Sequence, residues 1–378
     1  MRQSRVRAVF MRGGTSRALF FQEADLPKDI SARDRILLAA LGSPDPYGRQ
    51  LDGLGGGISS LSKAVIVGPP TTTDADLDYT FAQVSVSEPL VDYTGNCGNC
   101  TAAVGPFAID EGLVPAKEPE TAVRLHNTNT RKLVVARVSV ADGEAAATGD
   151  FELPGVPGRG ARIALNFLDP GGAVTGALLP TGKPRELLET PGVGSVEVSL
   201  VDATNPMVFV RARDLGCVGT EPPDAVDSDR PLLMKLEAIR RAAAGLMGLG
   251  ESPALPKVAM VAPPGEFSAL DGRPVRTDEA DVTARVISMG KCHRAFALTA
   301  AICLAVAARI EGSVVHEALG TAARRDGLLD LRLAHPSGIL PVNAVVELTR
   351  GLWQVRQVTV YRTARRLMEG WVRIPTPE

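Results

Sequence analysis

The chain has 378 residues, a length that predicts two domains at roughly 100–200 residues per domain. Hydrophobic residues make up 45% and charged residues 22%, which excludes disordered, collagen-like and fibrous proteins. Lys and Arg, 41 in all, nearly balance the 43 Asp and Glu, so no basic surface favours nucleic acid or an anionic membrane. We therefore expect a small-molecule partner, with no nucleic acid and no membrane involved.

The cysteines are an odd number scattered over a long chain, unlike the dense, even set of a small secreted domain. The basic residues after Met1 are not followed by an apolar signal core. The longest apolar stretch, residues 295–310, is shorter than the ~20 residues that a membrane span needs. These features predict reduced thiols and a cytoplasmic protein.

Aromatic residues are only 4%, whereas glycine (38) and proline (28) are plentiful, which favours short strands joined by tight turns. In chain order, runs rich in Val and Ile predict strands at residues 6–10, 17–21, 63–67, 79–86, 122–125, 132–140, 161–167, 195–201, 207–210, 257–261 and 282–287. Helical patterns occur at residues 32–41, 98–112, 232–246 and 291–309. We expect the last strand within residues 351–360.

The predicted helices at 98–112 and 291–309 are apolar on nearly every side, so each has to be enclosed by other elements. A strand, a polar turn and a second strand precede each of them at similar spacing, which indicates an internal duplication. We therefore expect an α/β (α+β) fold of two pseudo-symmetric domains, residues 1–183 and 184–378. Each domain would be a curved, mostly antiparallel sheet around a central helix, with the final strand free to pair with the first half.

Cys97 lies at the start of the first enclosed helix, within Gly95-Asn96-Cys97-Gly98-Asn99-Cys100. Free backbone N–H groups and the helix dipole make such a position an anion site and lower the pKa of a thiol. A thiolate there can move a proton. Two alternatives stay open: both cysteines are merely small buried residues beside a helix cap, or Cys97-x-x-Cys100 is half of a zinc site or a redox pair.

Lys63 follows a glycine-rich segment, residues 52–62, and opens an apolar strand. That segment leads from a loop into a strand, so it is not a phosphate-binding loop. Partial burial at the mouth of the strand would lower the pKa of Lys63 toward that of a useful base. The alternative is an exposed lysine at a strand end.

Two further segments carry groups suited to carboxylates. Residues 13–17 supply backbone N–H groups, two hydroxyls and a guanidinium, and residues 288–293 place a lysine at the predicted start of the second enclosed helix. Each also fits an ordinary turn or cap. Residues 126–130 and 334–338 are weaker candidates of the same kind. Two helix N-termini facing one another across a cleft would bind an acid with a carboxylate at each end, with Lys63 and Cys97 between them.

No dinucleotide-binding glycine motif, no nucleophile elbow and no carboxylate-rich metal motif occurs in the sequence. The remaining chemistry is proton transfer next to a carboxylate or carbonyl, with no cofactor and no metal.

Taken together, these motifs resemble the PrpF family, and the resemblance covers nearly the whole chain in order. It is carried by Met11-Arg12-Gly13-Gly14-Thr15-Ser16, Gly95-Asn96-Cys97-Gly98-Asn99, Asn127-Thr128-Asn129-Thr130, Pro180-Thr181-Gly182, Ser288-Met289-Gly290-Lys291 with His293, and His335-Pro336-Ser337-Gly338. That family includes methylaconitate cis–trans isomerase, 4-oxalomesaconate tautomerase and methylitaconate delta-isomerase, and it has the diaminopimelate epimerase fold. The resemblance thus implies two similar halves and an active site in the cleft between them.

The resemblance also implies a cofactor-independent 1,3-allylic proton shift in an unsaturated di- or tricarboxylic acid. Lys63 is the expected general base, and Cys97 the partner acid or an orienting group. The expected stabilisers of the dienolate are the N–H groups of Gly98, Asn99, Gly290 and Lys291. The expected ligands of the substrate are Thr15, Ser16, Arg17, Asn96, Gly98, Asn99, Gly290, Lys291, His293 and Ser337.

Two other functions remain open at this point. A racemase or epimerase with two thiols would use Cys97 together with Cys292, which lies close to the predicted start of the second enclosed helix. A binding protein for carboxylates would use the same cleft without catalysis. A homodimer is the default expectation for an enzyme of this kind.

Overall fold

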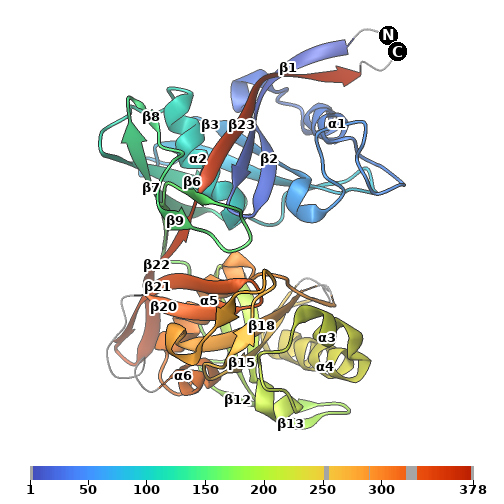
Figure 1. Ribbon diagram of the computed structural model, residues 1–378, viewed down its shortest axis with the longest axis vertical. Coiled ribbons are helices and arrows are strands. Elements are labelled where there is room, and N and C mark those ends of the chain that lie inside the picture. Colours follow the sequence, from blue (N-terminus) through green and yellow to red (C-terminus); the bar gives the residue numbers. More distant parts are fainter. Residues whose placement is uncertain (1–2, 251–254, 289, 321–329, 376–378) are drawn as a thin grey trace. The chain divides into compact units, whose positions relative to one another are not determined.

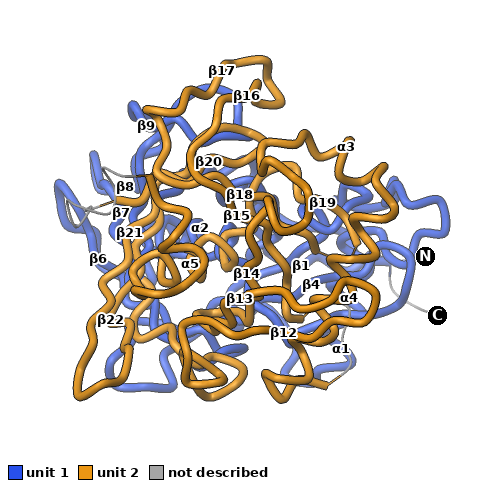
Figure 2. Tube along the Cα trace, turned by 90° about the horizontal axis from the view of Figure 1, so that it is seen from below, with its two compact units in different colours: residues 1–166, 361–378 blue, residues 167–360 orange. Residues whose placement is uncertain are grey.

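The structure is a computed structural model that describes residues 3–250, 255–288, 290–320 and 330–375. The chain forms two compact units, coloured separately in Figure 2, and each is described here by itself. Unit 1 comprises residues 1–166 and 361–378, and unit 2 comprises residues 167–360. The boundary expected between residues 183 and 184 therefore falls inside unit 2. Within the described ranges, no helix has both the length and the apolar content needed to cross a lipid bilayer.

Unit 1 contains β1 (Gln3–Gly13), β2 (Ser16–Gln22), η1 (Glu23–Asp25), α1 (Ile30–Leu41), η2 (Ser59–Leu61), β3 (Lys63–Gly68), β4 (Leu77–Val84), β5 (Val91–Asp92), α2 (Gly98–Asp110), β6 (Glu120–Asn127), β7 (Lys132–Ala141), β8 (Glu144–Ala145), β9 (Phe151–Glu152), β10 (Arg159–Gly160) and β23 (Ala364–Pro375). The strand β11 (Ile163–Leu168) begins in unit 1 and ends in unit 2. Figure 1 shows how these elements are arranged along the chain.

Unit 2 contains β12 (Glu186–Thr190), β13 (Gly194–Ala203), β14 (Asn205–Arg211), η3 (Ala212–Leu215), α3 (Pro223–Ser228), α4 (Arg230–Leu246), β15 (Lys257–Ala262), β16 (Phe267–Ser268), β17 (Pro274–Val275), η4 (Thr277–Glu279), β18 (Val282–Ser288), β19 (Lys291–Cys292), α5 (Leu298–Arg309), α6 (Val314–Ala318), β20 (Leu331–His335) and β21 (Gly338–Thr349). The strand β22 (Leu352–Arg362) begins in unit 2 and ends in unit 1.

The two units share one order of strand pairing. In unit 1, β1–β2 is antiparallel, β2–β3 parallel, β3–β4 antiparallel, β4–β6 parallel and β6–β7 antiparallel. In unit 2, β13–β14, β14–β15, β15–β18, β18–β20 and β20–β21 repeat that series in the same directions. The enclosed helix follows the fourth strand and a short fifth one in both units. This repetition confirms the internal duplication.

Helix α2 is the core of unit 1, and all but two of its 13 residues are buried. The helix contacts β1, β2, β7, β8 and β23. Gly105 lets it lie close to β7, because a Cβ added there would be 2.9 Å from Val138 Cγ2 and 3.1 Å from the Cβ of Ala136. Phe107 packs on Phe20 of β2 with 5.5 Å between the ring centroids. The apolar sequence of α2 is thus explained by enclosure on several sides.

Helix α1 covers the other face of the unit 1 sheet. Asp29 caps its start by accepting a hydrogen bond from Ala32 N, 2.8 Å, and Gly42 ends it in a left-handed conformation. Leu37 and Leu41 are buried in the cluster formed with β2 and β3. The helices predicted at 32–41 and 232–246 each begin two residues earlier in the structure, as α1 and α4.

The helix predicted at 291–309 is α5, and its predicted start is wrong. Residues 291 and 292 form the short strand β19, paired with β18, and α5 begins only at Leu298. The backbone N–H of Cys292 donates to Asp227 Oδ1, 2.7 Å, which holds the strand in place. The apolar run begins at residue 295, in the loop before α5, so residue composition alone does not mark where the helix starts.

The last strand was also placed wrongly from the sequence. Residues 351–360 belong largely to β22, which pairs with β21, whereas the strand that returns to the first half is β23. It pairs antiparallel with β1 from Gln3 opposite Pro375 to Gly13 opposite Ala364 (Figure 1). Only two residues of β23 are buried, so it lacks the apolar run by which strands were recognised.

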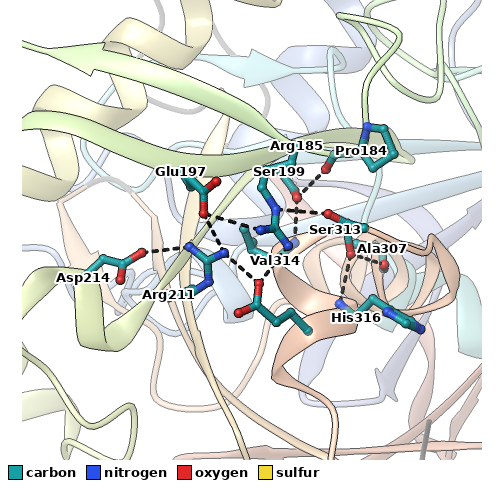
Figure 3. Close-up of polar contacts among 12 residues, drawn as sticks. Pro184, Arg185, Glu197, Ser199, Arg211, Asp214, Ala307, Ser313, Val314 and His316 are labelled. Carbon is teal, nitrogen blue, oxygen red and sulfur yellow. Dashed lines mark hydrogen bonds and ion pairs between the residues drawn. The ribbon is translucent and has the colours of Figure 1, made fainter. Parts of the chain in front are cut away.

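At one edge of unit 2 an ionic cluster joins β13, β14 and α6 (Figure 3). Arg211 Nη2 lies 2.8 Å from a carboxylate oxygen of Glu197 and 2.7 Å from one of Glu317, and Arg185 also donates to Glu317 at 2.7 Å. Ser313 caps α6, and its hydroxyl donates to a backbone carbonyl of α5 at 2.6 Å. The positive and negative groups here neutralise one another, so the cluster fixes α6.

The packing of α2 yields a first testable prediction. Gly105→Val introduces side-chain atoms where Val138 and Ala136 already stand, so we expect the free energy of unfolding to fall by about 1–3 kcal/mol. The exposed helical position Gly245 has open space around it, and Gly245→Ala should raise that free energy by about 0.5–1 kcal/mol. Urea denaturation of both variants measures the difference. Unchanged stability in Gly105→Val would contradict the close packing of α2.

Candidate active site

Lys63, the first residue of β3, is buried, with 7% of its surface exposed. Its ammonium group donates a hydrogen bond to Oε1 of Gln83, the residue opposite it on β4. Its Nζ lies 5.0 Å from the ring centroid of Phe81. The side chain is therefore held on the side of the sheet that faces α2, and it is not an exposed strand-end lysine.

Cys97 is the N-cap residue of α2, so its side chain lies where the helix presents free N–H groups. Its carbonyl accepts a hydrogen bond from Thr101 N, 2.9 Å. Its Sγ is 3.9 Å from Ser16 Oγ of β2. Cys97 as a whole residue is half-buried.

Several groups around Cys97 favour its thiolate. A hydrogen bond from the Cys100 thiol, the positive charge of Lys63 and a hydrogen bond from Ser16 together hold the pKa of Cys97 well below its usual value, although burial opposes them. Burial and the neighbouring Cys97 raise the pKa of Cys100 well above its usual value. The structure thus supports a thiolate at Cys97 and a protonated thiol at Cys100.

The two thiols are free. Among the described residues no group of three or more His, Cys, Asp or Glu side chains is arranged to hold a metal ion. The zinc half-site that the Cys97-x-x-Cys100 spacing left open therefore gains no further ligands in that part of the chain.

A buried polar network supports the first turn of α2. Asn96 Nδ2 donates to Tyr79 Oη, 3.2 Å, and that oxygen lies 3.0 Å from Thr101 Oγ1. Tyr79 is 1% exposed, and its burial raises the pKa of the phenol. A neutral tyrosine therefore stands beneath the helix start, and it fixes Asn96 next to Cys97.

The β1–β2 turn lies directly against the same helix turn. A Cβ on Gly13 would be 2.3 Å from the carbonyl oxygen of Asn99, and a Cβ on Gly14 would be 2.2 Å from its Oδ1. Gly14 also has φ +51°, a conformation that favours glycine. Asn99 Nδ2 donates to Thr15 Oγ1 at 3.0 Å. The two glycines are required because any side chain would push the turn away from Asn99.

Arg17 does not join this cluster. Successive residues of a strand point to opposite faces, and Ser16 shares its face with Phe20, which packs on α2. Arg17 shares the other face with Leu19, which packs against α1. Its Nη2 lies 3.0 Å from the Cβ position of Gly56, in the glycine-rich segment. The structure thus separates Arg17 from Thr15 and Ser16, with which the sequence grouped it.

The candidates in unit 2 lie in two segments, one between β18 and α5 and the other in the turn between β20 and β21. Gly290 lies in the turn before β19, and the exposed Lys291 is the first residue of that strand, so their N–H groups are not at a helix start as the sequence predicted. His293 Nδ1 accepts a hydrogen bond from a backbone N–H two residues on, 3.2 Å, and burial lowers its pKa, which favours the neutral ring. Ser337 Oγ donates to the carbonyl of Arg294 at 2.7 Å, which brings the two loops together.

The duplication identifies the counterparts of the unit 1 groups. The N-cap of α5 is Ala297, which takes the place of Cys97. The contact of the hairpin turn with the helix is repeated, since Thr204 Oγ1 donates to the carbonyl of Thr299 at 3.3 Å. Cys292 lies in β19, is 4% exposed, and has its pKa raised to about 11 mainly by burial. Unit 2 therefore carries no thiol at the start of α5, where a two-thiol epimerase would need one.

Lys257 takes the place of Lys63, because each is the first residue of the equivalent strand. Burial lowers the pKa of Lys257 to about 8, and its charge lowers the pKa of His293. Among the residues described, a lysine beside a thiol at the start of an enclosed helix thus occurs only in unit 1.

Sequence reasoning missed several groups that shape the site. Gln83 and Tyr79 lie on β4 and read as ordinary strand residues. Asn129, in a segment that was only a weak candidate, donates to the carbonyls of Phe81 and Tyr93, 2.9 and 2.7 Å, and so holds the loop before α2. Arg362, more than 260 residues after Asn99, donates from Nε to its Oδ1 at 3.0 Å. Only the sheet pairing brings these positions together, so no local pattern could reveal them.

Comparison with known proteins shows the family to which the chain belongs. The family described as PrpF protein matches residues 3–375. The chain belongs to the PrpF family. It is 43% identical to "3-methylitaconate isomerase" of Eubacterium barkeri, over 98% of this chain and 97% of that protein. It is 41% identical to "2-methyl-aconitate isomerase" of Shewanella oneidensis (99% and 98%) and 40% identical to "4-oxalomesaconate tautomerase" of Pseudomonas putida (98% and 97%). The protein is an isomerase.

Solved structures of related proteins have the same fold as this chain. A crystal structure of methylitaconate delta-isomerase, 43% identical, superposes with a TM-score of 0.89 over 98% of this chain and 96% of that one. A hydroxyproline epimerase from Agrobacterium vitis, 14% identical, superposes with a TM-score of 0.53 over 99% and 94%. This second likeness concerns the fold alone, and it confirms the expected diaminopimelate epimerase-like architecture.

The environment of Cys97 yields a second prediction. Cys100→Ala removes the hydrogen bond that most favours the thiolate, so the pKa of Cys97 should rise. The pH at which iodoacetamide alkylates Cys97 at half its maximal rate should move upward, as followed by peptide mass spectrometry. Cys303→Ala serves as the control, because it removes a buried thiol that lies in unit 2 instead of unit 1. It should leave that pH unchanged. If the pH of half-maximal alkylation were the same in Cys100→Ala as in the unaltered protein, the Cys100 thiol would not be the group that stabilises the Cys97 thiolate.

Proposed function

We propose that the protein catalyses a 1,3-allylic proton shift in an unsaturated di- or tricarboxylic acid, using Lys63 and Cys97 and no cofactor. The observation that carries the proposal is the lysine–thiolate pair at the start of α2, in which the charge of Lys63 lowers the pKa of Cys97. The relatives at 40–43% identity are named for isomerising or tautomerising 3-methylitaconate, 2-methylaconitate and 4-oxalomesaconate. Acids of that type are the proposed substrates.

The reaction needs one group to remove the allylic proton and another to return a proton two carbons away. The sequence assigned the base to Lys63 and the acid to Cys97. The lowered pKa of Cys97 favours the reverse division in the free enzyme, with the thiolate as base and the Lys63 ammonium as acid. The C–H electrons move into a dienolate, and reprotonation at the far carbon leaves the double bond displaced by one position.

The dienolate would be stabilised by the N–H groups of Gly98 and Asn99, which open α2 and are not used within the helix. Thr15 and Ser16, placed beside them by the β1–β2 turn, are the proposed hydroxyl ligands of a substrate carboxylate. For Gly290, Lys291, His293 and Ser337, binding of a carboxylate stays a prediction.

Turnover of variants tests the proposal. Lys63→Ala should lower kcat by at least about 100-fold, the usual contribution of a positioned acid or base, and Cys97→Ser should do the same while substrate still binds. Lys183→Ala, an exposed lysine of unit 2, should have no effect. Proton NMR in D2O with the three acids named above measures both double-bond migration and deuterium uptake. Near-normal turnover in Lys63→Ala would overturn the mechanism.

The same assay separates the alternatives. Cys292→Ala should turn over at the rate of the unaltered enzyme, because Cys292 is buried in β19 with a raised pKa. A loss as large as that in Cys97→Ala would instead favour a two-thiol epimerase. Binding of the acids without deuterium uptake would favour a carboxylate-binding protein.

A further inference from the structure

Arg362 is a buried cation that the mechanism above does not use. It ends β22 and belongs to the C-terminal segment that joins unit 1. Only 4% of its surface is exposed. Enclosing a guanidinium is costly unless an anion or a full set of hydrogen-bond acceptors compensates it, so its partners decide what it does.

The partners of Arg362 leave one end of the guanidinium unused. Nε donates to Asn99 Oδ1 at 3.0 Å, and Nη1 donates to the carbonyl of Tyr361 at 2.8 Å. In the part of the chain that the structure describes, Nη2 has no hydrogen-bond partner and no carboxylate pairs with the group. Nη2 nevertheless keeps some exposed surface, although the residue as a whole is buried.

The position of Arg362 is tied to the candidate active site by two contacts. Its Cδ lies 3.1 Å from the Cβ position of Gly14, so the glycine of the β1–β2 turn leaves room for the side chain. Its Nε bond is to the side chain of Asn99, the second residue of α2. Burial lowers the pKa of Arg362 to about 10, and a charge on Cys97 acts in the opposite direction.

We propose that Arg362 is a specificity-determining residue that binds a carboxylate of the substrate through Nη2 beside the N-terminus of α2. In this arrangement the N–H groups at the start of α2 and the guanidinium would donate to one anion, and such charge-assisted bonds are strong. That the anion is part of the substrate rests on the proposed function. The preference of the site for a carboxylate does not depend on the proposed function, so this preference can be tested without measuring turnover.

A purely structural role is the competing explanation. Arg362 would then only fasten the C-terminal segment to α2 through Asn99. The two roles differ in one measurable respect. An arginine that binds a carboxylate discriminates between a charged and a neutral molecule of the same size, whereas an arginine that only holds the C-terminal segment in place does not.

Alkylation of Cys97 by iodoacetate and by iodoacetamide measures this discrimination. The two reagents differ by a carboxylate in place of an amide, and any change in the pKa of Cys97 affects both rates equally. We expect Arg362→Gln to lower the ratio of the iodoacetate rate to the iodoacetamide rate by about tenfold or more, the loss of a hydrogen bond to a charged group. Arg365→Gln removes the same charge from an exposed position three residues on and should leave the ratio unchanged.

Arg362→Lys is a second variant in case Arg362→Gln does not fold. It keeps the positive charge but lacks the planar guanidinium, which can donate two hydrogen bonds to one carboxylate. It should lower the ratio less than Arg362→Gln does, at a melting temperature near that of the unaltered protein. With an acid that the enzyme isomerises, it should raise KM about tenfold with a smaller change in kcat.

An unchanged ratio in folded Arg362→Gln and Arg362→Lys, or an equal slowing of both reagents, would overturn the proposal in favour of the structural role. Absence of turnover of all three acids by the unaltered enzyme would refute the proposed function alone, because the alkylation ratio would still report on the carboxylate site.

Discussion

The contact between Asn99 and the glycines of the β1–β2 turn is the constraint on which the site depends. Gly13 and Gly14 let two backbones come closer than any other residue would allow. That approach places Thr15 and Ser16 beside Asn99 and Cys97. The carboxamide of Asn99 donates to Thr15 and also accepts a hydrogen bond from Arg362. A hairpin turn, a helix start and the end of β22 thus meet at one asparagine.

The enclosure of α2 explains why this constraint is rigid. A helix packed on several sides cannot shift without disturbing the strands around it, and the close approach at Gly105 removes the room for movement. The buried hydroxyls of Tyr79 and Thr101 support the same helix turn from below. Rigidity matters for proton transfer because the acid and the base must each reach a different carbon of one bound molecule.

Among the described residues, the duplicated fold has a lysine and a thiol at the start of its enclosed helix in unit 1 only. The strand pairing, the hairpin turn and the enclosed helix are repeated in unit 2, and Lys257 repeats Lys63. At the helix start, however, Ala297 stands where unit 1 has Cys97. The fold is thus compatible with a thiol in each half, as in the two-thiol alternative, but this sequence retains one. A single thiol beside a lysine suits transfer between two positions on one face of a planar acid.

The sequence was a good guide wherever the signal was local. The strand pattern, the two enclosed helices, and the positions of Lys63 at a strand start and Cys97 at a helix start all follow from runs of neighbouring residues. It was a poor guide where strand pairing decides the structure. Arg17 adjoins Ser16 in sequence but points to the other face of β2. The start of α5 is not marked either, because residues 291 and 292 pair with β18 and the apolar run begins in the loop before the helix. Arg362 is brought to Asn99 only by the return of the C-terminal segment.

The central claim is that the allylic carbon of an unsaturated acid lies against Cys97 at the start of α2. The most direct measurement is a crystal structure of Lys63→Ala bound to an acid that the unaltered enzyme turns over. The account predicts a substrate carbon about 3.5 Å from Cys97 Sγ and a carboxylate at the N–H groups of Gly98 and Asn99. An acid bound elsewhere in the chain, with Cys97 touching none of its reacting carbons, would contradict the account.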